Sequence, residues 1–114
     1  LPKIFYVNWF RRGENGRFLW PGYGENSRVL KWVLEQVEGA NNSVESPIGY
    51  LPAKGAIDVS GLEINPEDIA EALRIDPNEW RAEIPLIEEW FEKIGSKLPD
   101  ELRKELATLK NNIE

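Results

Sequence analysis

The sequence has no cysteine, no histidine and no methionine among its 114 residues. Without cysteine, the chain can form neither a disulfide nor a thiolate metal site, and its redox compartment stays undetermined. Without histidine, it lacks the commonest general base and metal ligand. Because methionine is absent even at position 1, we expect the chain to be cut or trimmed from a longer one.

Long apolar runs are also missing. No stretch approaches the roughly 20 residues that span a bilayer, and no signal-peptide pattern occurs. We therefore predict a cytoplasmic protein without a membrane partner. Hydrophobic residues make up 41% and charged residues 30% of the sequence, which is ordinary for a globular protein. The length allows one domain with a modest core, or one piece of a larger domain.

The net charge of −6 is unevenly distributed along the chain. Residues 1–34 contain six basic and two acidic side chains, whereas residues 35–114 contain eight basic and eighteen acidic ones. Seven of the twelve aromatic residues lie within the first 23 positions. A basic, aromatic front suits an anionic ligand that carries a flat ring. A core hairpin with solvated arginines on its outer face would show the same pattern, so charge alone leaves both interpretations open.

The hydrophobic pattern predicts an α+β fold that begins with a β-hairpin. Side chains alternate over residues 4–10 as they do in a strand. Residues 13–16 contain an Asn-Gly pair, which is typical of a hairpin turn. Residues 17–20 would return as the second strand, which Pro21 ends.

A helix is expected next, followed by a loop. Asn26 or Ser27 can cap this helix, and Gly39 ends it. Residues 40–61 are rich in Asn, Ser, Gly and Pro, as loops are, with a short extended piece near residues 48–51.

The C-terminal half is predicted to be mostly helical, with three helices in the region 64–114. Asn65 and Asp76 each precede a proline and would cap the first two helices. The last helix begins at about Pro99. Pro85 lies within the apolar stripe of the second helix and is expected to kink or divide it.

Two acidic pairs of this region, 67–68 and 88–89, invite a metal-binding or acid–base interpretation. They lie in a first helical turn or opposite an apolar stripe, where carboxylates suit the helix dipole and solvent. We interpret them as structural, and we assign Trp80, Trp90 and Phe91 to the core. No P-loop, nucleophile–base pair or metal cluster occurs in the sequence. The prediction for this chain is therefore no catalytic and no metal-binding residue.

The most unusual stretch is "FLWPGYGEN" at residues 18–26, which places three aromatic rings beside two glycines. Planar side chains can stack on a flat heteroaromatic ring, which contributes about 1–3 kcal/mol per base. Gly22 and Gly24 would let the backbone approach the edge of such a ring. Asn26 offers both a donor and an acceptor, as a purine edge requires. A packed hairpin is the alternative interpretation.

The segments "NWFR", "FLWPG" and "GENSRVL", with "ESPIGYLP" and "IPLIEEWF" further on, closely resemble the C-terminal end of GTP-dependent phosphoenolpyruvate carboxykinase. The resemblance covers essentially the full length. It implies that residues 1–114 are the C-terminal portion of the GTP-binding, P-loop domain, and thus part of a larger carboxykinase domain. In that family, a gluconeogenic lyase converts oxaloacetate and GTP to phosphoenolpyruvate, carbon dioxide and GDP.

The resemblance also implies a guanine pocket in the region 8–26. Its expected members are aromatic walls and a glycine-containing loop: Trp9, Phe10, Phe18, Tyr23, Gly24, Glu25 and Asn26. Trp9 and Phe10 would wall the pocket, and the rings of Phe18 and Tyr23 would close on the base. The family more often has phenylalanine at the position of Tyr23. Residues 24–26 would lie along the guanine edge.

The family's P-loop, its metal-binding lysine, histidine and aspartate, its substrate arginines and its mobile lid lie upstream of this region. The resemblance therefore implies that Mn²⁺ or Mg²⁺ binds outside this chain, while the chain contacts GTP or GDP. The expected partner is the missing N-terminal portion of the same enzyme, not a nucleic acid, and the isolated chain is expected to be inactive. The alternative is a stand-alone binding or interaction module whose aromatic hairpin docks another ligand or a protein.

Overall fold

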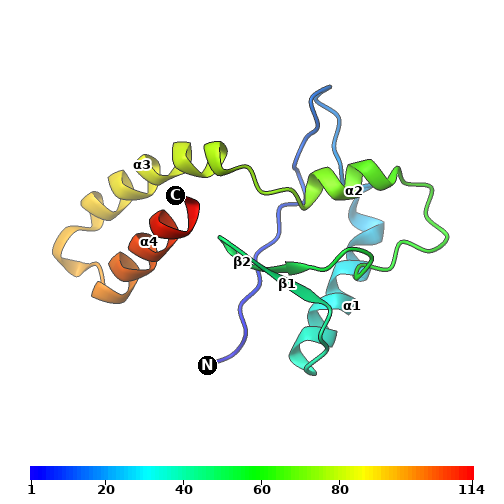
Figure 1. Ribbon diagram of the computed structural model, residues 1–114, viewed down its shortest axis with the longest axis horizontal. Coiled ribbons are helices and arrows are strands. Elements are labelled where there is room, and N and C mark those ends of the chain that lie inside the picture. The colour runs from blue at the N-terminus through cyan, green and yellow to red at the C-terminus, as the bar shows by residue number, and fades with distance from the viewer. The chain divides into compact units, whose positions relative to one another are not determined.

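The structure, a computed structural model, describes all residues from 1 to 114. It comprises two compact units: unit 1 contains residues 1–45 and 50–74, and unit 2 contains residues 46–49 and 75–114. Figure 1 labels the helices and strands in chain order: α1 (Asn26–Val37), β1 (Ser43–Ser46), β2 (Gly49–Pro52), α2 (Pro66–Ala72), α3 (Pro77–Ile94) and α4 (Asp100–Ile113). Helices together with paired strands confirm the predicted α+β class.

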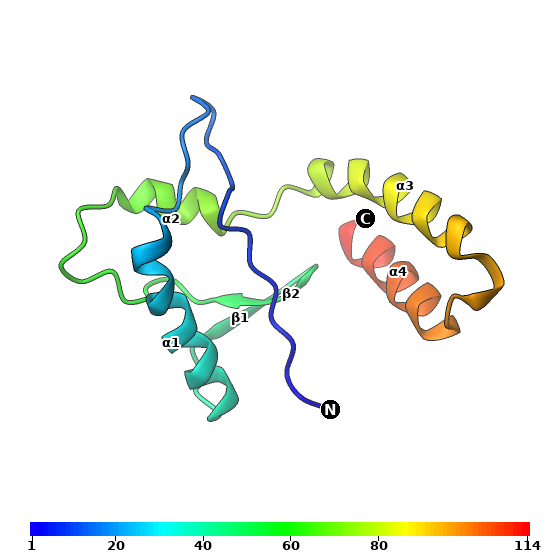
Figure 2. The same ribbon diagram turned by 180° about the vertical axis from the view of Figure 1, so that it is seen from behind.

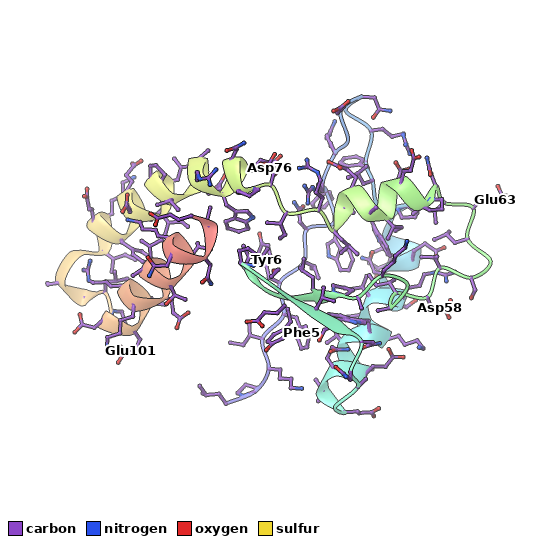
Figure 3. The ribbon with its side chains drawn as sticks, viewed as in Figure 1. Phe5, Tyr6, Asp58, Glu63, Asp76 and Glu101 are labelled. Carbon is purple, nitrogen blue, oxygen red and sulfur yellow. The ribbon has the colours of Figure 1, made fainter.

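The N-terminal segment forms no strand over residues 4–10, although its alternation predicts one. Figures 1 and 2 show it, in blue, as an irregular coil. A strand needs a neighbouring backbone for its ladder of hydrogen bonds, and no other segment of this chain pairs with residues 4–10. Phe5 packs edge to face on Trp32 of α1, with ring centroids 5.9 Å apart. Its neighbour Tyr6, labelled with it in Figure 3, is exposed.

The turn predicted between Gly13 and Gly16 is present. The N–H of Gly16 donates to the carbonyl of Gly13 at 2.9 Å, and Gly16 has a φ of 74°, which favours glycine. Beyond the turn, a single antiparallel bridge joins Arg12 and Phe18. The returning strand expected over residues 17–20 is therefore reduced to one bridge, because its predicted partner is not a strand.

Helix α1 follows a short 3₁₀ turn, Tyr23–Glu25, and ends where predicted. Gly39 has a φ of 93° and donates its N–H to the carbonyl of Gln36 at 3.2 Å, as a helix-ending glycine does. The predicted cap is wrong, since Glu25 occupies the N-cap position and no side chain caps the helix. Asn26 already lies inside the helix because the 3₁₀ turn runs directly into it.

The core of unit 1 is small and is completed by a polar link. Its buried apolar side chains are Leu19, Trp32 and Ile57. The hairpin of β1 and β2 includes the extended piece predicted near residues 48–51. The indole N–H of Trp32 donates to the carbonyl of Asn42 at 3.3 Å, and the side chain of Gln36 donates to that of Asn42. These bonds tie the residue just before β1 to helix α1.

Unit 2 consists mainly of α3 and α4, which lie side by side in both views (Figures 1 and 2). A 3₁₀ turn, Gly95–Lys97, joins them, and Leu98 and Ile113 are buried. Pro85 lies inside α3, which continues unbroken past it. The predicted division of this helix therefore does not occur.

Both proline-led caps are confirmed. The Oδ1 atom of Asn65 accepts from the N–H of Glu67 at 3.0 Å at the start of α2. The Oδ1 atom of Asp76 accepts from the N–H of Asn78 at 2.9 Å at the start of α3. None of the helices has the length and apolarity that a membrane crossing requires.

The interpretation of Trp90 as a core residue is wrong. Its side chain is 65% exposed, and the ammonium group of Lys93 lies 5.1 Å from its ring centroid. The two residues are three positions apart on α3, so they share an exposed face of the helix.

Candidate functional site

A cleft of about 360 Å³ lies in unit 1, where the aromatic loop of residues 18–25 meets the start of α1. The residues that line it come from the N-terminal segment, the 3₁₀ turn and the first helical turns: Trp9, Tyr23, Gly24, Asn26, Ser27 and Leu30. Its volume falls within the range of small-molecule sites. Four of the seven residues that the sequence assigns to a pocket are thus found together.

The loop before α1 explains how the cleft forms. Gly22 has a φ of 139°, which glycine adopts without strain, and its carbonyl accepts from the N–H of Glu25 at 3.0 Å. This turn leaves the ring of Tyr23 92% exposed. At Gly24 an added Cβ would meet no atom of the chain within 4 Å, and the backbone there does not require glycine. Folding of this chain therefore does not account for the glycine at position 24.

Trp20 contacts two of the residues that line the cleft, Asn26 and Trp9. The indole N–H of Trp20 donates to Oδ1 of Asn26 at 2.8 Å. The ring of Trp20 lies tilted against that of Trp9, with centroids 6.0 Å apart. Trp20 itself is not among the lining residues, so it supports two of them without facing the cleft.

The two phenylalanines of the predicted pocket lie together but do not line the cleft. Phe10 and Phe18 have ring centroids 6.2 Å apart in an edge-on arrangement, and both are substantially exposed. The guanidinium carbon of Arg12 lies 4.3 Å from the ring centroid of Phe18, so that Arg12 covers one face of the Phe18 ring. A base could stack on Phe18 only at the other face or after Arg12 moves.

Glu25 is the third predicted residue outside the lining. Its carboxylate accepts from Nε of Arg28 at 2.5 Å, and Arg28 also donates to the carbonyl of Asp58 at 2.8 Å. Arg28 therefore links α1 to the loop that contains Asp58, labelled in Figure 3, and the Glu25 carboxylate pairs with it.

The basic side chains of residues 1–34 bind mainly to other residues of unit 1. Arg17 binds both carboxylate oxygens of Asp68, at 2.9 and 3.1 Å. Arg11 donates to the carbonyls of Ala72 and Arg74 at the end of α2. No basic side chain lines the cleft. These contacts favour a structural role for the clustered charge, and the cleft is suited to an uncharged ring.

The groups with displaced pKa values lie outside the cleft lining. A hydrogen bond to Glu35 raises the pKa of Lys31, and the same bond lowers the pKa of Glu35. Hydrogen bonds from Ser60 lower the pKa of Asp58. No group of three or more acidic side chains is placed to hold a metal ion. The residues that line the cleft include no carboxylate, lysine or arginine, so the lining offers no acid–base pair for a reaction.

A second cleft, of about 280 Å³, lies in unit 2 beside the C-terminal end of α4. Its two basic side chains already have partners within the unit. Arg81 donates to the carbonyl of Ile113 at 3.1 Å, and Lys110 pairs with Glu88. We therefore regard the cleft in unit 1 as the candidate site.

Three residues of the site region are missing from the sequence prediction. Leu30 follows Asn26 by four positions, so the helical repeat could have placed both on one face. For Ser27 the sequence predicts only a role as a helix cap. Nothing in the sequence singles out Trp20, because its hydrogen bond to Asn26 depends on the path of the intervening turn.

Comparison with known proteins relates the whole chain to one family. The family described as phosphoenolpyruvate carboxykinase C-terminal P-loop domain matches residues 1–112. A phosphoenolpyruvate carboxykinase [GTP] of Neocallimastix frontalis is 53% identical over 115 aligned positions, which cover 100% of this chain and 19% of that protein. The proteins of the same name from Paenarthrobacter aurescens and Corynebacterium kroppenstedtii are 50% and 44% identical, over 99% and 100% of this chain. The chain spans about a fifth of the length of these relatives, at 18–19%.

Proposed function

The chain belongs to the family of GTP-dependent phosphoenolpyruvate carboxykinases, and we propose that it forms the guanine-recognition part of such an enzyme. The observation that carries this proposal is the shared cleft of Trp9, Tyr23, Gly24 and Asn26. The enzyme would convert oxaloacetate and GTP to phosphoenolpyruvate, carbon dioxide and GDP, in the cytoplasm and in the service of gluconeogenesis.

Two features support an aromatic base as the ligand. The exposed ring of Tyr23 has no packing function within the chain, and a flat ring is the natural partner for such a surface. The open space beside Gly24 would let another molecule approach the backbone there. Together they provide a stacking surface with open backbone next to it.

The remaining parts of the pocket would assemble when the nucleotide binds. Phe10 and Phe18 lie against each other beside the cleft residue Trp9, and both side chains are substantially exposed. A small movement of Arg12 would free the covered face of Phe18. Glu25 would contribute through its backbone, since its carboxylate is bound to Arg28.

The phosphates and the metal belong to the part of the enzyme outside this chain. The cleft has no basic lining, and the chain's carboxylates form no metal-binding cluster, so the residues present do not fit Mn²⁺ or Mg²⁺. In phosphoryl transfer, metal ions neutralise charge on the phosphate oxygens. That task falls to the N-terminal portion, which is the proposed partner of this chain.

A stand-alone interaction module is the second candidate, and one observation favours it. Apolar side chains of the N-terminal segment, such as Ile4 and Tyr6, are almost fully exposed, as they are on docking surfaces. The same surface would be covered by the rest of a carboxykinase.

The decisive experiment is a calorimetric titration of the full-length enzyme with GDP and with ADP. We expect GDP to bind more tightly, and Tyr23→Ala to weaken GDP by roughly 5- to 150-fold, corresponding to about 1–3 kcal/mol of stacking. Tyr50→Ala, which removes an exposed tyrosine away from the cleft, is the matched control and should leave affinity unchanged. Equal affinities in all three proteins would reject the proposed function.

A further inference from the structure

We propose that Trp20 is a positioning residue that fixes the side-chain amide of Asn26, so that its NH₂ group faces the ligand. The inference rests on the proposed function of the cleft and adds a source for its choice of base. It starts from the hydrogen bond between Nε1 of Trp20 and Oδ1 of Asn26, at 2.8 Å.

The chemistry of the two groups determines which end of the amide faces Trp20. An indole N–H is a donor only, whereas an asparagine amide has a donor end and an acceptor end. The atom of Asn26 beside the indole must therefore be the oxygen. A rotated amide would oppose its own N–H groups to the N–H of Trp20 and lose the bond. Trp20 thus selects one of two orientations that are similar in shape.

The donor end of Asn26 is left for the ligand. No hydrogen bond within the protein uses Nδ2, and no unpaired side-chain nitrogen in the structure is buried. Asn26 lines the cleft, and its unpaired, unburied Nδ2 is the end of the amide that remains for a ligand. The cleft therefore presents a donor whose direction is set from outside the cleft.

A fixed donor distinguishes the two common purines. Guanine has a carbonyl oxygen at position 6, which accepts a hydrogen bond, whereas adenine has an amino group there. Facing adenine, the NH₂ of Asn26 would meet a second donor and stay unpaired, which a polar site penalises. If the amide could rotate, its oxygen would accept from the adenine amino group. The N–H of Trp20 prevents that rotation and so converts an ambivalent side chain into one that favours guanine.

Trp20 also has a packing role, and the test must separate the two. Its ring contacts Trp9, so replacing it would disturb the fold to some degree. Trp20→Phe retains an aromatic ring and removes only the N–H and part of the ring. Trp32→Phe is the matched control, because Trp32 is a more buried tryptophan that donates its N–H to the carbonyl of Asn42, outside the cleft lining.

The experiment compares GTP, ITP and ATP as substrates of the full-length enzyme, using kcat/KM for each. We expect Trp20→Phe to reduce the GTP-to-ATP ratio by about tenfold, the size of one lost polar discrimination. GTP and ITP should fall together, since both have the oxygen at position 6. Trp32→Phe should lower the melting temperature and leave the ratio unchanged.

A double-mutant cycle with Asn26→Ala shows whether Trp20 acts through Asn26. In the Asn26→Ala enzyme, adding Trp20→Phe should leave the GTP-to-ATP ratio where it was. An unchanged ratio in the single variant Trp20→Phe, or an equal loss with Trp32→Phe, would overturn the proposal. So would a full effect of Trp20→Phe in the absence of Asn26.

Failure of the inference is distinguishable from failure of the proposed function. If Asn26→Ala and Tyr23→Ala alter nucleotide use but Trp20→Phe does not, the cleft binds the base and only the role of Trp20 is rejected. If none of the three changes nucleotide use, the base binds elsewhere and both proposals are rejected.

Discussion

In unit 2, Leu98 and Ile113 are each only 5% exposed, whereas in unit 1 Ile4 and Tyr6 are 91% and 95% exposed. The helices of unit 2 are fixed by local signals, such as the cap at Asp76 and the helical spacing of apolar residues. The first ten residues of unit 1 have strand-like alternation but no strand to pair with. The contrast teaches that unit 2 forms its helices from local signals, although side chains such as Trp90 stay exposed, while the front of unit 1 has a strand-like pattern without a partner strand in this chain.

The largest effect on activity should come from testing this chain without the rest of the proposed enzyme. We expect the isolated 114-residue chain to form no phosphoenolpyruvate from oxaloacetate and GTP in the presence of Mn²⁺, because its sequence contains no P-loop and its carboxylates form no metal-binding cluster. A coupled assay beside the full-length enzyme measures this. Any metal-dependent turnover by the isolated chain would show that the chemistry resides here after all.

A matched pair of substitutions in the full-length enzyme should sharpen the comparison between the units. Leu98→Ala, in unit 2, should lower the free energy of unfolding by about 2–5 kcal/mol, as expected for a buried leucine, and leave nucleotide affinity intact. Phe18→Ala, in unit 1, should weaken GTP binding by about 1–3 kcal/mol, the stacking scale. Oxaloacetate binding should barely change in either variant.

Denaturant unfolding and a GDP titration on the same samples distinguish the two roles. Phe18 is 46% exposed, so a large loss of stability is not expected for Phe18→Ala. If that variant instead unfolds several kcal/mol more easily and binds GDP normally, Phe18 packs against the rest of the enzyme. Phe18 in unit 1 and Leu98 in unit 2 would then both serve stability, and the two units would not differ in the role of these side chains.

The sequence predicts best those features that neighbouring residues determine. The proline-led caps at Asn65 and Asp76, the end of α1 at Gly39 and the turn at Gly16 all depend on a few adjacent positions. The strand over residues 4–10 fails because pairing depends on a distant partner, and alternation alone cannot supply one.

The candidate site divides in the same way. Trp9, Tyr23, Gly24 and Asn26 line one cleft, because most of them belong to one short loop, whereas their contact with guanine stays a prediction. The role of Trp20 could not be predicted, since the bond from its indole to Asn26 depends on the three-dimensional path of the turn between them.

The smallest expected effect compares two asparagines that look alike in sequence, since each stands at the start of a helix. Asn65 caps α2 with its Oδ1 atom, whereas Oδ1 of Asn26 accepts from the indole N–H of Trp20 and the Asn26 side chain caps no helix. In the full-length enzyme, Asn65→Ala should lower the free energy of unfolding by about 1 kcal/mol, the usual cost of a lost cap. It should leave the GTP-to-ATP ratio of kcat/KM unchanged.

Asn26→Ala should lower the GTP-to-ATP ratio of kcat/KM by a factor that corresponds to about 1–3 kcal/mol, because the donor at the base edge is lost. The stability of helix α1 should change little. Thermal unfolding and the specificity ratio, measured on both variants, check the pair. If Asn26→Ala behaves like Asn65→Ala, with a lower melting temperature and an unchanged ratio, its side chain serves only the fold. Selectivity must then come from the backbone of residues 23–25.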